Sequence, residues 1–185
     1  MTNFSFKMLA AAVMSAMTIG VSAEQIKWYD GHHAVTFNVQ KNSEPVVKMA
    51  LDMFCGDMEA VTGKRAEAAG LKNAAVRIVQ LNNAAGSVAK ELSRAGVPID
   101  ELVGKTDDFH ISVINGQITI VGINGRGTAY GILELSRMAG VSPWIWWGDL
   151  VPEKKSQLTI DSGFTTLQGA SVEAMVGTMI TGIPR

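Results

Sequence analysis

Two runs of alternating β-favouring residues flank an Asn-Gly dipeptide near the middle of the chain. The runs are residues 109–113 and 117–121, and the connection between them contains Asn115 and Gly116. Asn-Gly favours the two positive φ values that a type I′ turn requires. The two runs therefore predict an antiparallel β-hairpin, and a fold of this chain has to accommodate it.

A long amphipathic helix is predicted upstream of the hairpin. Apolar side chains recur there every three or four residues, which places them on one helical stripe: Val47, Leu51, Phe54, Met58 and Val61. Ser43 offers a capping oxygen before the stripe, and Pro45 stands in the first turn. Gly63 is expected to end the helix.

Shorter patterns complete the prediction. Strands are expected at residues 35–39, 76–81 and 158–160, and short helices at 86–95 and 99–103. A second long helix follows the glycine-rich segment after residue 121, with Ile132, Leu135 and Ala139 on one side and Gly140 at its end. We therefore predict an α/β (α+β) fold, a small mixed sheet of four or five strands with two long helices packed on one face.

Length and composition limit the function. The chain has 185 residues, 47% of them hydrophobic, and a formal charge of −1. A near-neutral chain gives no electrostatic reason to expect nucleic acid as a partner, and one cysteine excludes an internal disulfide. A full (β/α)₈ barrel needs roughly 250 residues, so we expect no such barrel within these 185 residues. We expect an α/β domain over residues 24–170 and an irregular tail over 171–185.

The first 23 residues are interpreted as a secretory signal peptide. Lys7 supplies a positive charge, residues 8–21 are largely apolar, and Val21-Ser22-Ala23 offers small residues for cleavage before Glu24. An apolar stretch of this length is too short to span a bilayer about 30 Å thick as a helix. The mature protein is therefore expected to be extracytoplasmic, periplasmic or secreted, and not bound to a membrane.

Several residues invite a chemical role but favour a structural interpretation. Gly125, Gly127 and Gly131 follow a strand and open a helix, but their spacing is one residue longer than that of the dinucleotide-binding fingerprint, so we interpret them as a tight strand-to-helix turn. Cys55, which lies beside the apolar stripe, is expected to pack as a small hydrophobe.

The histidines and the paired aspartates give no catalytic signal either. His32 and His33 alternate on a strand and point to opposite faces, and His110 has no partner at metal-ligand spacing. Asp107 and Asp108 stand just before the hairpin, where adjacent aspartates usually cap backbone amides. We expect no metal and no cofactor.

A tryptophan cluster is the strongest anomaly in composition. Trp144, Trp146 and Trp147 are three of the four tryptophans, and Asp149 and Glu153 lie close by. Indoles stack on sugar faces and also fill interfaces. In an extended segment Trp144 and Trp146 would share a face, with Trp147 opposite. We favour packing, within the domain or against a neighbour, over ligand stacking.

The segment that contains this cluster resembles a known family. Residues 125–152 read GRGTAYGILELSRMAGVSPWIWWGDLVP. This run resembles the N-terminal domain of glycoside hydrolase family 115, whose pattern is R-G-T-x-Y-G-I, then V-S-P-W-x-W-W and D-x-x-P. Residues 58–64 (MEAVTGK) and the hairpin are also similar, and the resemblance covers about residues 26–171.

The resemblance implies a non-catalytic part of an enzyme. Family members are α-glucuronidases that act on xylan side chains. Their first domain is a small α/β module, similar to those before the barrels of hexosaminidases, and the catalytic residues lie on a barrel that follows it. No catalytic residue is therefore carried over. The candidates for a substrate rim or a domain interface are Arg126, Trp144, Trp146, Trp147 and Asp149.

These implications lead to one hypothesis and one alternative. The chain is expected to be the N-terminal domain of a secreted xylan α-glucuronidase-like enzyme, inactive alone, truncated before its catalytic barrel. The barrel, missing or on a separate chain, is the expected partner, with a xylan-derived glycan as a further one. The alternative is a free-standing glycan-binding module that uses the cluster from Trp144 to Trp147.

Overall fold

The computed structural model describes residues 24–148 and 150–168. They form three layers, with a six-stranded sheet between two layers of helices. The strands are β1 (Gln25–Tyr29), β2 (Thr36–Val39), β3 (Glu67–Ala68), β4 (Val76–Gln80), β5 (Phe109–Ile114), β6 (Gln117–Gly122), β7 (Leu158–Asp161) and β8 (Thr165–Gln168). The helices are α1 (Pro45–Thr62), α2 (Gly86–Arg94), α3 (Ile99–Leu102), α4 (Gly125–Ala139) and α5 (Ile145–Gly148), with a 3₁₀ turn at Leu81–Asn83.

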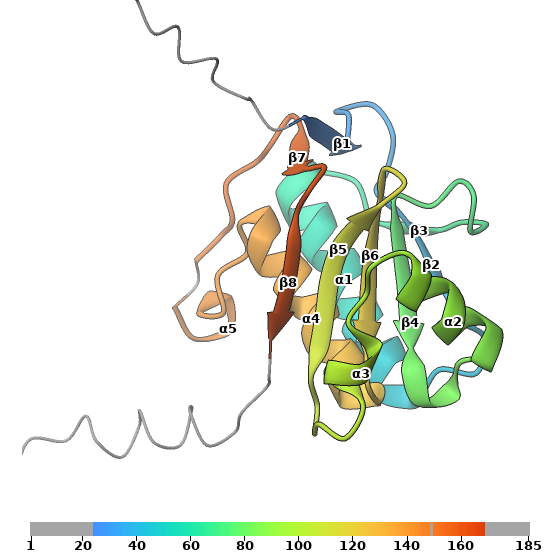
Figure 1. Cartoon of the computed structure of the whole chain (residues 1–185). Helices are drawn as coiled ribbons and strands as arrows, with labels where there is room; N and C mark the ends of the chain where they lie inside the picture. Colours follow the sequence, from blue (N-terminus) through green and yellow to red (C-terminus); the bar gives the residue numbers. More distant parts are fainter. Residues whose placement is uncertain (1–23, 149, 169–185) are drawn as a thin grey trace, which may run out of the picture.

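The large sheet has the order β3-β2-β4-β6-β5-β8 (Figure 1). Strands β3, β2, β4 and β6 are parallel, and β5 runs antiparallel to both β6 and β8. Strands β1 and β7 pair separately as a two-stranded antiparallel sheet. The carboxyl ends of β2, β4 and β6 therefore lie at the same end of the sheet, and α1 and α4 both begin at that end.

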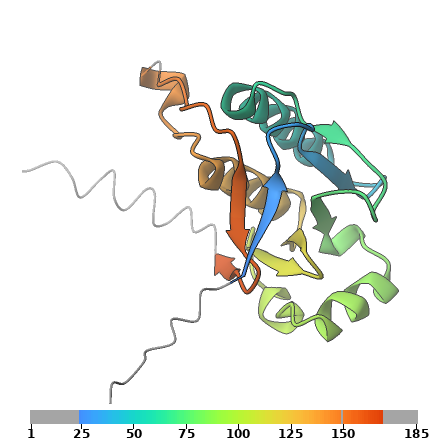
Figure 2. The same ribbon diagram turned by 90° about the horizontal axis from the view of Figure 1, so that it is seen from above.

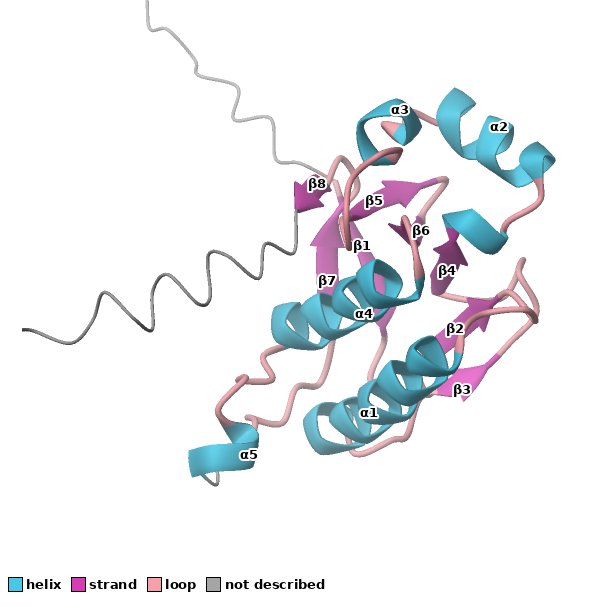
Figure 3. Ribbon diagram, turned by 90° about the horizontal axis from the view of Figure 1, so that it is seen from below, coloured by secondary structure: helices cyan, strands magenta, loops and turns pink. Residues whose placement is uncertain are grey.

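The two long helices cover one face of the large sheet, and the short helices α2 and α3 cover the other (Figures 2 and 3). Under the long helices, the core includes Phe54 and Met58 of α1, Ile132 and Leu135 of α4, and Ile120 of β6. The opposite face has its own smaller cluster, which comprises Val79, Leu92, Val97, Leu102 and Val121.

Helix α1 forms as its apolar stripe predicts. All five stripe residues from Val47 to Val61 are buried, and the helix ends at Gly63, whose φ is 80°. The expected start differs. Glu44, rather than Ser43, occupies the N-cap position, and the Ser43 hydroxyl donates a hydrogen bond to the Gln40 carbonyl oxygen at 2.8 Å. The prediction that Ser43 caps the helix is therefore wrong, and Pro45 sets the helix start.

The hairpin and the second long helix are also confirmed. Asn115 and Gly116 have φ values of 51° and 75°, and β5 pairs with β6 from Phe109↔Gly122 to Ile114↔Gln117. Helix α4 ends at Gly140, whose φ is 105°. The Asn124 side chain caps its start by accepting a hydrogen bond from the Gly127 amide at 2.8 Å.

The predicted fold class is confirmed, with more strands than expected. The large sheet has six strands, and the predicted last strand, β7, belongs to the small sheet instead. The additional strands are β1, β3 and β8. β3 has two residues and β8 lies at the sheet edge with mostly exposed side chains, so neither has the apolar alternation that marks a half-buried strand.

Candidate interface along helices α1 and α4

An ion pair joins the first turn of α4 to the loop before β5. The Asp107 carboxylate lies 3.0 Å from the Arg126 guanidinium, and it accepts a hydrogen bond from the Asn124 side-chain amide at 2.9 Å. Asp107 is buried and has a φ of 63°, a left-handed conformation that Asp tolerates better than most residues. The expectation that this aspartate caps backbone amides is wrong, because its carboxylate contacts two side chains.

Arg126 is held but remains accessible. Its side chain is 57% exposed, and a hydrogen bond with Tyr130 together with the nearby Asp107 carboxylate raises the pKa of its guanidinium. One of its donors faces Asp107, so the other N–H groups can reach a second acceptor. The residue after it has to be glycine, because a Cβ on Gly127 would collide with the backbone carbonyl of Asp108.

Two further glycines of α4, Gly125 and Gly131, also have close neighbours. A Cβ on Gly125 would lie 2.5 Å from the Glu44 carboxylate, so this glycine lets Glu44 approach the positive end of the helix. A Cβ on Gly131 would lie 2.6 Å from Ile120, which shows how closely α4 packs on β6. Both positions support the interpretation of these glycines as structural.

Polar side chains of the protein itself fill the crevice at the carboxyl ends of the parallel strands, where open α/β sheets commonly bind ligands. Gln80 is fully buried and donates from its side-chain amide to Glu44 and Asn82. Its backbone amide donates to the Gln40 side chain at 3.2 Å, and its carbonyl accepts from that side chain at 2.9 Å. This network joins β2, β4 and α1, and its groups satisfy one another.

An apolar groove runs along the outer side of α1 and α4, which lie side by side (Figure 3). One hollow of about 340 Å³ lies between Val46, Met49 and Met53 of α1 and Arg126, Tyr130 and Leu133 of α4. A second hollow of about 230 Å³ shares Met53 and Leu133 with the first and extends to Asp57, Arg137 and Ile145. We call these two hollows together the α1–α4 groove.

Large apolar side chains are exposed at the groove and on the segment after α4. The exposed fraction is 67% for Met49 and 64% for Trp144. Leu150 and Val151, further along the chain, are exposed at 50% and 85%. Exposed apolar side chains of this size are common at interaction sites when they form one continuous patch.

The tryptophan segment lies at the opposite end of α4 from Arg126. Trp144 lies in a turn, and Trp146 and Trp147 are within the single helical turn of α5. The extended arrangement considered above is therefore not adopted. With 64% of its surface exposed, Trp144 is not part of the core formed by the described residues. Asp149 lies outside the described residues.

The structure therefore separates the candidate residues into two groups. Helix α4 has 15 residues, so its two ends are about 20 Å apart, with Arg126 in the first turn and Trp144 in the segment that follows the last. The α1–α4 groove connects the two regions. The sequence pattern predicts neither the groove nor the Asp107–Arg126 pair, although Asn124, a favoured N-cap residue placed three residues before Gly127, marks where the helix starts.

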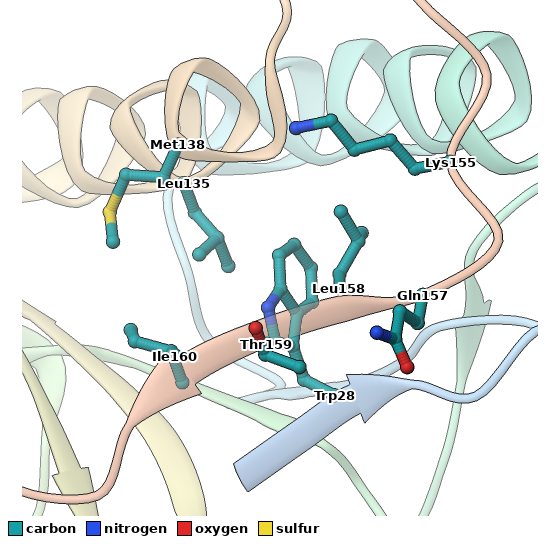
Figure 4. Close-up of a pocket in the computed structure, with 8 residues that line it drawn as sticks. All are labelled: Trp28, Leu135, Met138, Lys155, Gln157, Leu158, Thr159 and Ile160. Carbon is teal, nitrogen blue, oxygen red and sulfur yellow. The ribbon is translucent and has the colours of Figure 1, made fainter. Parts of the chain in front are cut away.

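A smaller hollow of about 170 Å³ lies between the β1–β7 sheet and the end of α4 (Figure 4). Leu135 and Met138 of α4, Lys155 and residues of β7 surround Trp28 there. The Trp28 indole is 7% exposed, so its ring faces are not available for stacking on a sugar. Trp28 therefore joins the small sheet to α4.

The remaining cysteine, aspartate and histidine side chains that were considered are either buried or engaged in local contacts. Cys55 is buried, and burial raises the pKa of its thiol. The exposed Asp30 carboxylate accepts from the backbone amides of His32 and His33 and contacts the His33 ring, which together lower the pKa of Asp30. Burial lowers the pKa of His110. Across residues 24–148 and 150–168, no group of three such side chains could hold a metal ion.

One further property concerns membranes. Among the described helices, none combines the length and the apolar character needed to cross a bilayer.

Comparison with known proteins identifies the type of domain. No protein-family model matches the sequence, and no curated protein matches it either. A solved structure that does match is the family GH115 4-O-methyl-α-glucuronidase BtGH115A, reported to be specific for decorated arabinogalactans, with 34% sequence identity and a TM-score of 0.64. The match covers 76% of this chain and 18% of that enzyme.

A second solved structure, CpGH84D, matches with 17% identity and a TM-score of 0.46, over 75% of this chain and 21% of the other. The present chain thus spans about a fifth of the length of the proteins that it matches. We conclude that this chain contains a glycoside-hydrolase-associated domain, similar in sequence and fold to a segment of a family GH115 α-glucuronidase.

Proposed function

We propose that this domain is the non-catalytic N-terminal domain of a secreted xylan α-glucuronidase-like glycoside hydrolase, and that it supports a catalytic barrel. The observation that carries the proposal is the 34% identity over 76% of the chain to a segment that makes up 18% of a GH115 α-glucuronidase. A segment of that size in a larger enzyme implies further domains beside it.

The chemistry of the groove favours a supporting role over a catalytic one. Hydrolysis of a glycosidic bond needs two carboxyl groups that face each other about 5 to 10 Å apart across the substrate. Among the described residues that line the α1–α4 groove, Asp57 is the one carboxylate. The buried Asp107 carboxylate is already engaged by Arg126 and Asn124.

Arg126, Trp144, Trp146, Trp147 and Asp149 are the proposed contacts to the neighbouring domain or to the rim of its substrate site. Exposure of Arg126 and Trp144 supports this assignment. The proposed location is outside the cytoplasm, since residues 1–23 have the sequence features of a secretory signal peptide.

Two measurements test the proposal. The purified 185-residue chain is assayed on glucuronoxylan oligosaccharides and on decorated arabinogalactan, and we expect no release of glucuronic acid from either. The matching segment of BtGH115A is then replaced by residues 24–168 of this chain. We expect this chimera to keep its activity, whereas BtGH115A without the segment should be insoluble or inactive. Turnover by the chain alone, or an inactive but folded chimera, would contradict the proposal.

A second candidate function is a free-standing glycan-binding module. The observation that favours it is the 64% exposure of Trp144, which leaves an indole available for stacking on a sugar. Titration with xylan fragments, followed by tryptophan fluorescence, separates the two functions. A stacking site shifts the emission of the wild-type chain and not that of a Trp144→Ala variant.

A further inference from the structure

We propose that the α1–α4 groove binds a helix of the neighbouring domain, and that this helix places a carboxylate against Arg126 and an apolar stripe against Met49, Met53 and Leu133. The inference rests on the proposed function for the origin of the helix. It adds which face of this domain is covered and what chemistry the covering segment has.

The carboxylate is inferred from the way Arg126 is held. The ion pair with the buried Asp107 holds the guanidinium beside the hollow that Tyr130 also lines, although the Arg126 side chain is 57% exposed. A guanidinium presents five N–H donors in a rigid fork that fits a carboxylate. An anion that approaches from the groove therefore meets donors that are already oriented, which reduces the entropy cost of the contact.

The apolar stripe is inferred from the middle of the groove. Met49 is 67% exposed, and Met53 and Leu133 line both hollows. Methionine side chains are flexible and polarizable, and they adapt to a partner of irregular shape. Covering them removes apolar surface from water, which favours association.

A helix is inferred from the shape and length of the groove. Two helices that lie side by side present a valley that takes the ridge of a third helix. On α4 the lining residues follow the helical spacing from Arg126 through Tyr130 and Leu133 to Arg137. This stripe is about 16 Å long, or three turns, too extended for a small ligand in one hollow and suited to a protein segment.

The charges along the groove indicate where along it the carboxylate of the partner lies. Near the far end, the Arg137 guanidinium contacts Glu134 at 2.6 Å, so this base already has a partner on its own helix. Asp57 lies at that end as well, and burial raises the pKa of its carboxyl. A carboxylate on the partner is therefore favoured at the Arg126 end and disfavoured at the Asp57 end.

The test uses two synthetic peptides and the full 185-residue chain. Each peptide is about 15 residues long, long enough to form roughly four helical turns, acetylated and amidated, with leucines at every third or fourth position. One carries a glutamate at one end of the stripe, and the other carries glutamine there. Binding is followed by NMR of the methionine methyl groups, with Met49 and Met53 assigned through Met49→Leu and Met53→Leu variants.

We expect the glutamate peptide to bind about three- to fivefold more tightly than the glutamine peptide, the size of an exposed ion pair. The Met49 and Met53 methyl signals shift, while that of Met138, which lines the hollow beside Trp28, stays in place. Arg126→Gln removes the preference for glutamate. The matched control Arg94→Gln, at the exposed end of α2 on the other face, retains it.

Three results would overturn the proposal: equal binding of the two peptides, absence of binding, or methyl shifts that appear with protein concentration alone and so assign the groove to a second copy of the chain. These results are separable from a failure of the proposed function. An active chimera with no peptide discrimination leaves the supporting role intact and rejects this groove as the docking site. If the chain distinguishes the two peptides but the chimera is folded and inactive, the chemistry of the groove stands and the assignment to a glycoside hydrolase is rejected.

Discussion

Asp107 is the buried and Arg126 the exposed member of one ion pair, with 5% and 57% of their side chains accessible and 3.0 Å between the charged groups. The acid lies in the loop before β5, and the base lies in the first turn of α4. The buried carboxylate therefore ties the start of the helix to the sheet edge and, at the same time, orients a guanidinium that faces outward.

Replacing Asp107 by asparagine is expected to destabilise the domain by about 1 to 2 kcal/mol, the range for weakening a buried, charge-assisted hydrogen bond. Asparagine tolerates the left-handed φ of 63° as well as aspartate does, so the backbone is kept and the charge alone is lost. Urea unfolding at neutral pH measures the change. Asp108→Asn is the control, and an equal loss in both variants would contradict a special role for Asp107.

Gly131→Ala is expected to destabilise the domain by about 1 to 3 kcal/mol, the usual cost of overpacking a core. The added Cβ would lie 2.6 Å from a methyl group of Ile120, a fully buried residue, so α4 has to move away from β6. Thermal unfolding compares this variant with Gly70→Ala, where a Cβ has nothing within 4 Å. Similar melting temperatures for the two variants would show that α4 packs on β6 less tightly than the 2.6 Å approach indicates.

Asn124→Ala is expected to cost about 1 kcal/mol through loss of the helix cap. The Asn124 side chain accepts from the Gly127 amide at 2.8 Å and also donates to Asp107, so both the helix start and the ion pair are affected. Asn124→Asp keeps a capping oxygen but brings a second carboxylate beside Asp107. Urea unfolding at neutral pH should therefore place Asn124→Asp between wild type and Asn124→Ala.

The elements predicted correctly are those whose signals are local. The hairpin depends on Asn115 and Gly116, whose backbone preference acts at the turn itself. Helix α1 depends on a stripe of five apolar residues followed by Gly63, and both act within a single element. Such signals do not depend on what packs against the element, so they can be recognised in a single sequence.

The elements and contacts that were not predicted depend on distant parts of the chain. Strand β8 is held by pairing with β5 rather than by its own exposed side chains. The Asp107–Arg126 pair and the α1–α4 groove exist only after the sheet has brought α1, α4 and the loop before β5 together. Of the candidate residues, Arg126 and Trp144 are placed by the structure at opposite ends of α4, which their shared sequence segment does not reveal.

The last prediction concerns His110, whose buried ring makes stability depend on pH. The ring is 3% exposed, its Nδ1 has no hydrogen-bond partner among the described residues, and burial lowers its pKa below the ordinary 6.5. Below about pH 6.5 the unfolded chain binds a proton that the native state resists. The free energy of unfolding should therefore fall with decreasing pH, by at most about 1.4 kcal/mol per pH unit, and the loss should level off once the pH is below the native pKa.

Chemical unfolding between pH 5.5 and 8 measures this dependence, and His110→Leu, which cannot bind the proton, should remove it. Asp57 acts in the opposite direction, because burial raises its pKa and native-state protonation offsets part of the loss at low pH. The difference between the wild-type and His110→Leu curves cancels this contribution, since Asp57 is present in both. Parallel curves over the whole range would mean that water reaches the His110 ring and that its charge is not excluded from the fold.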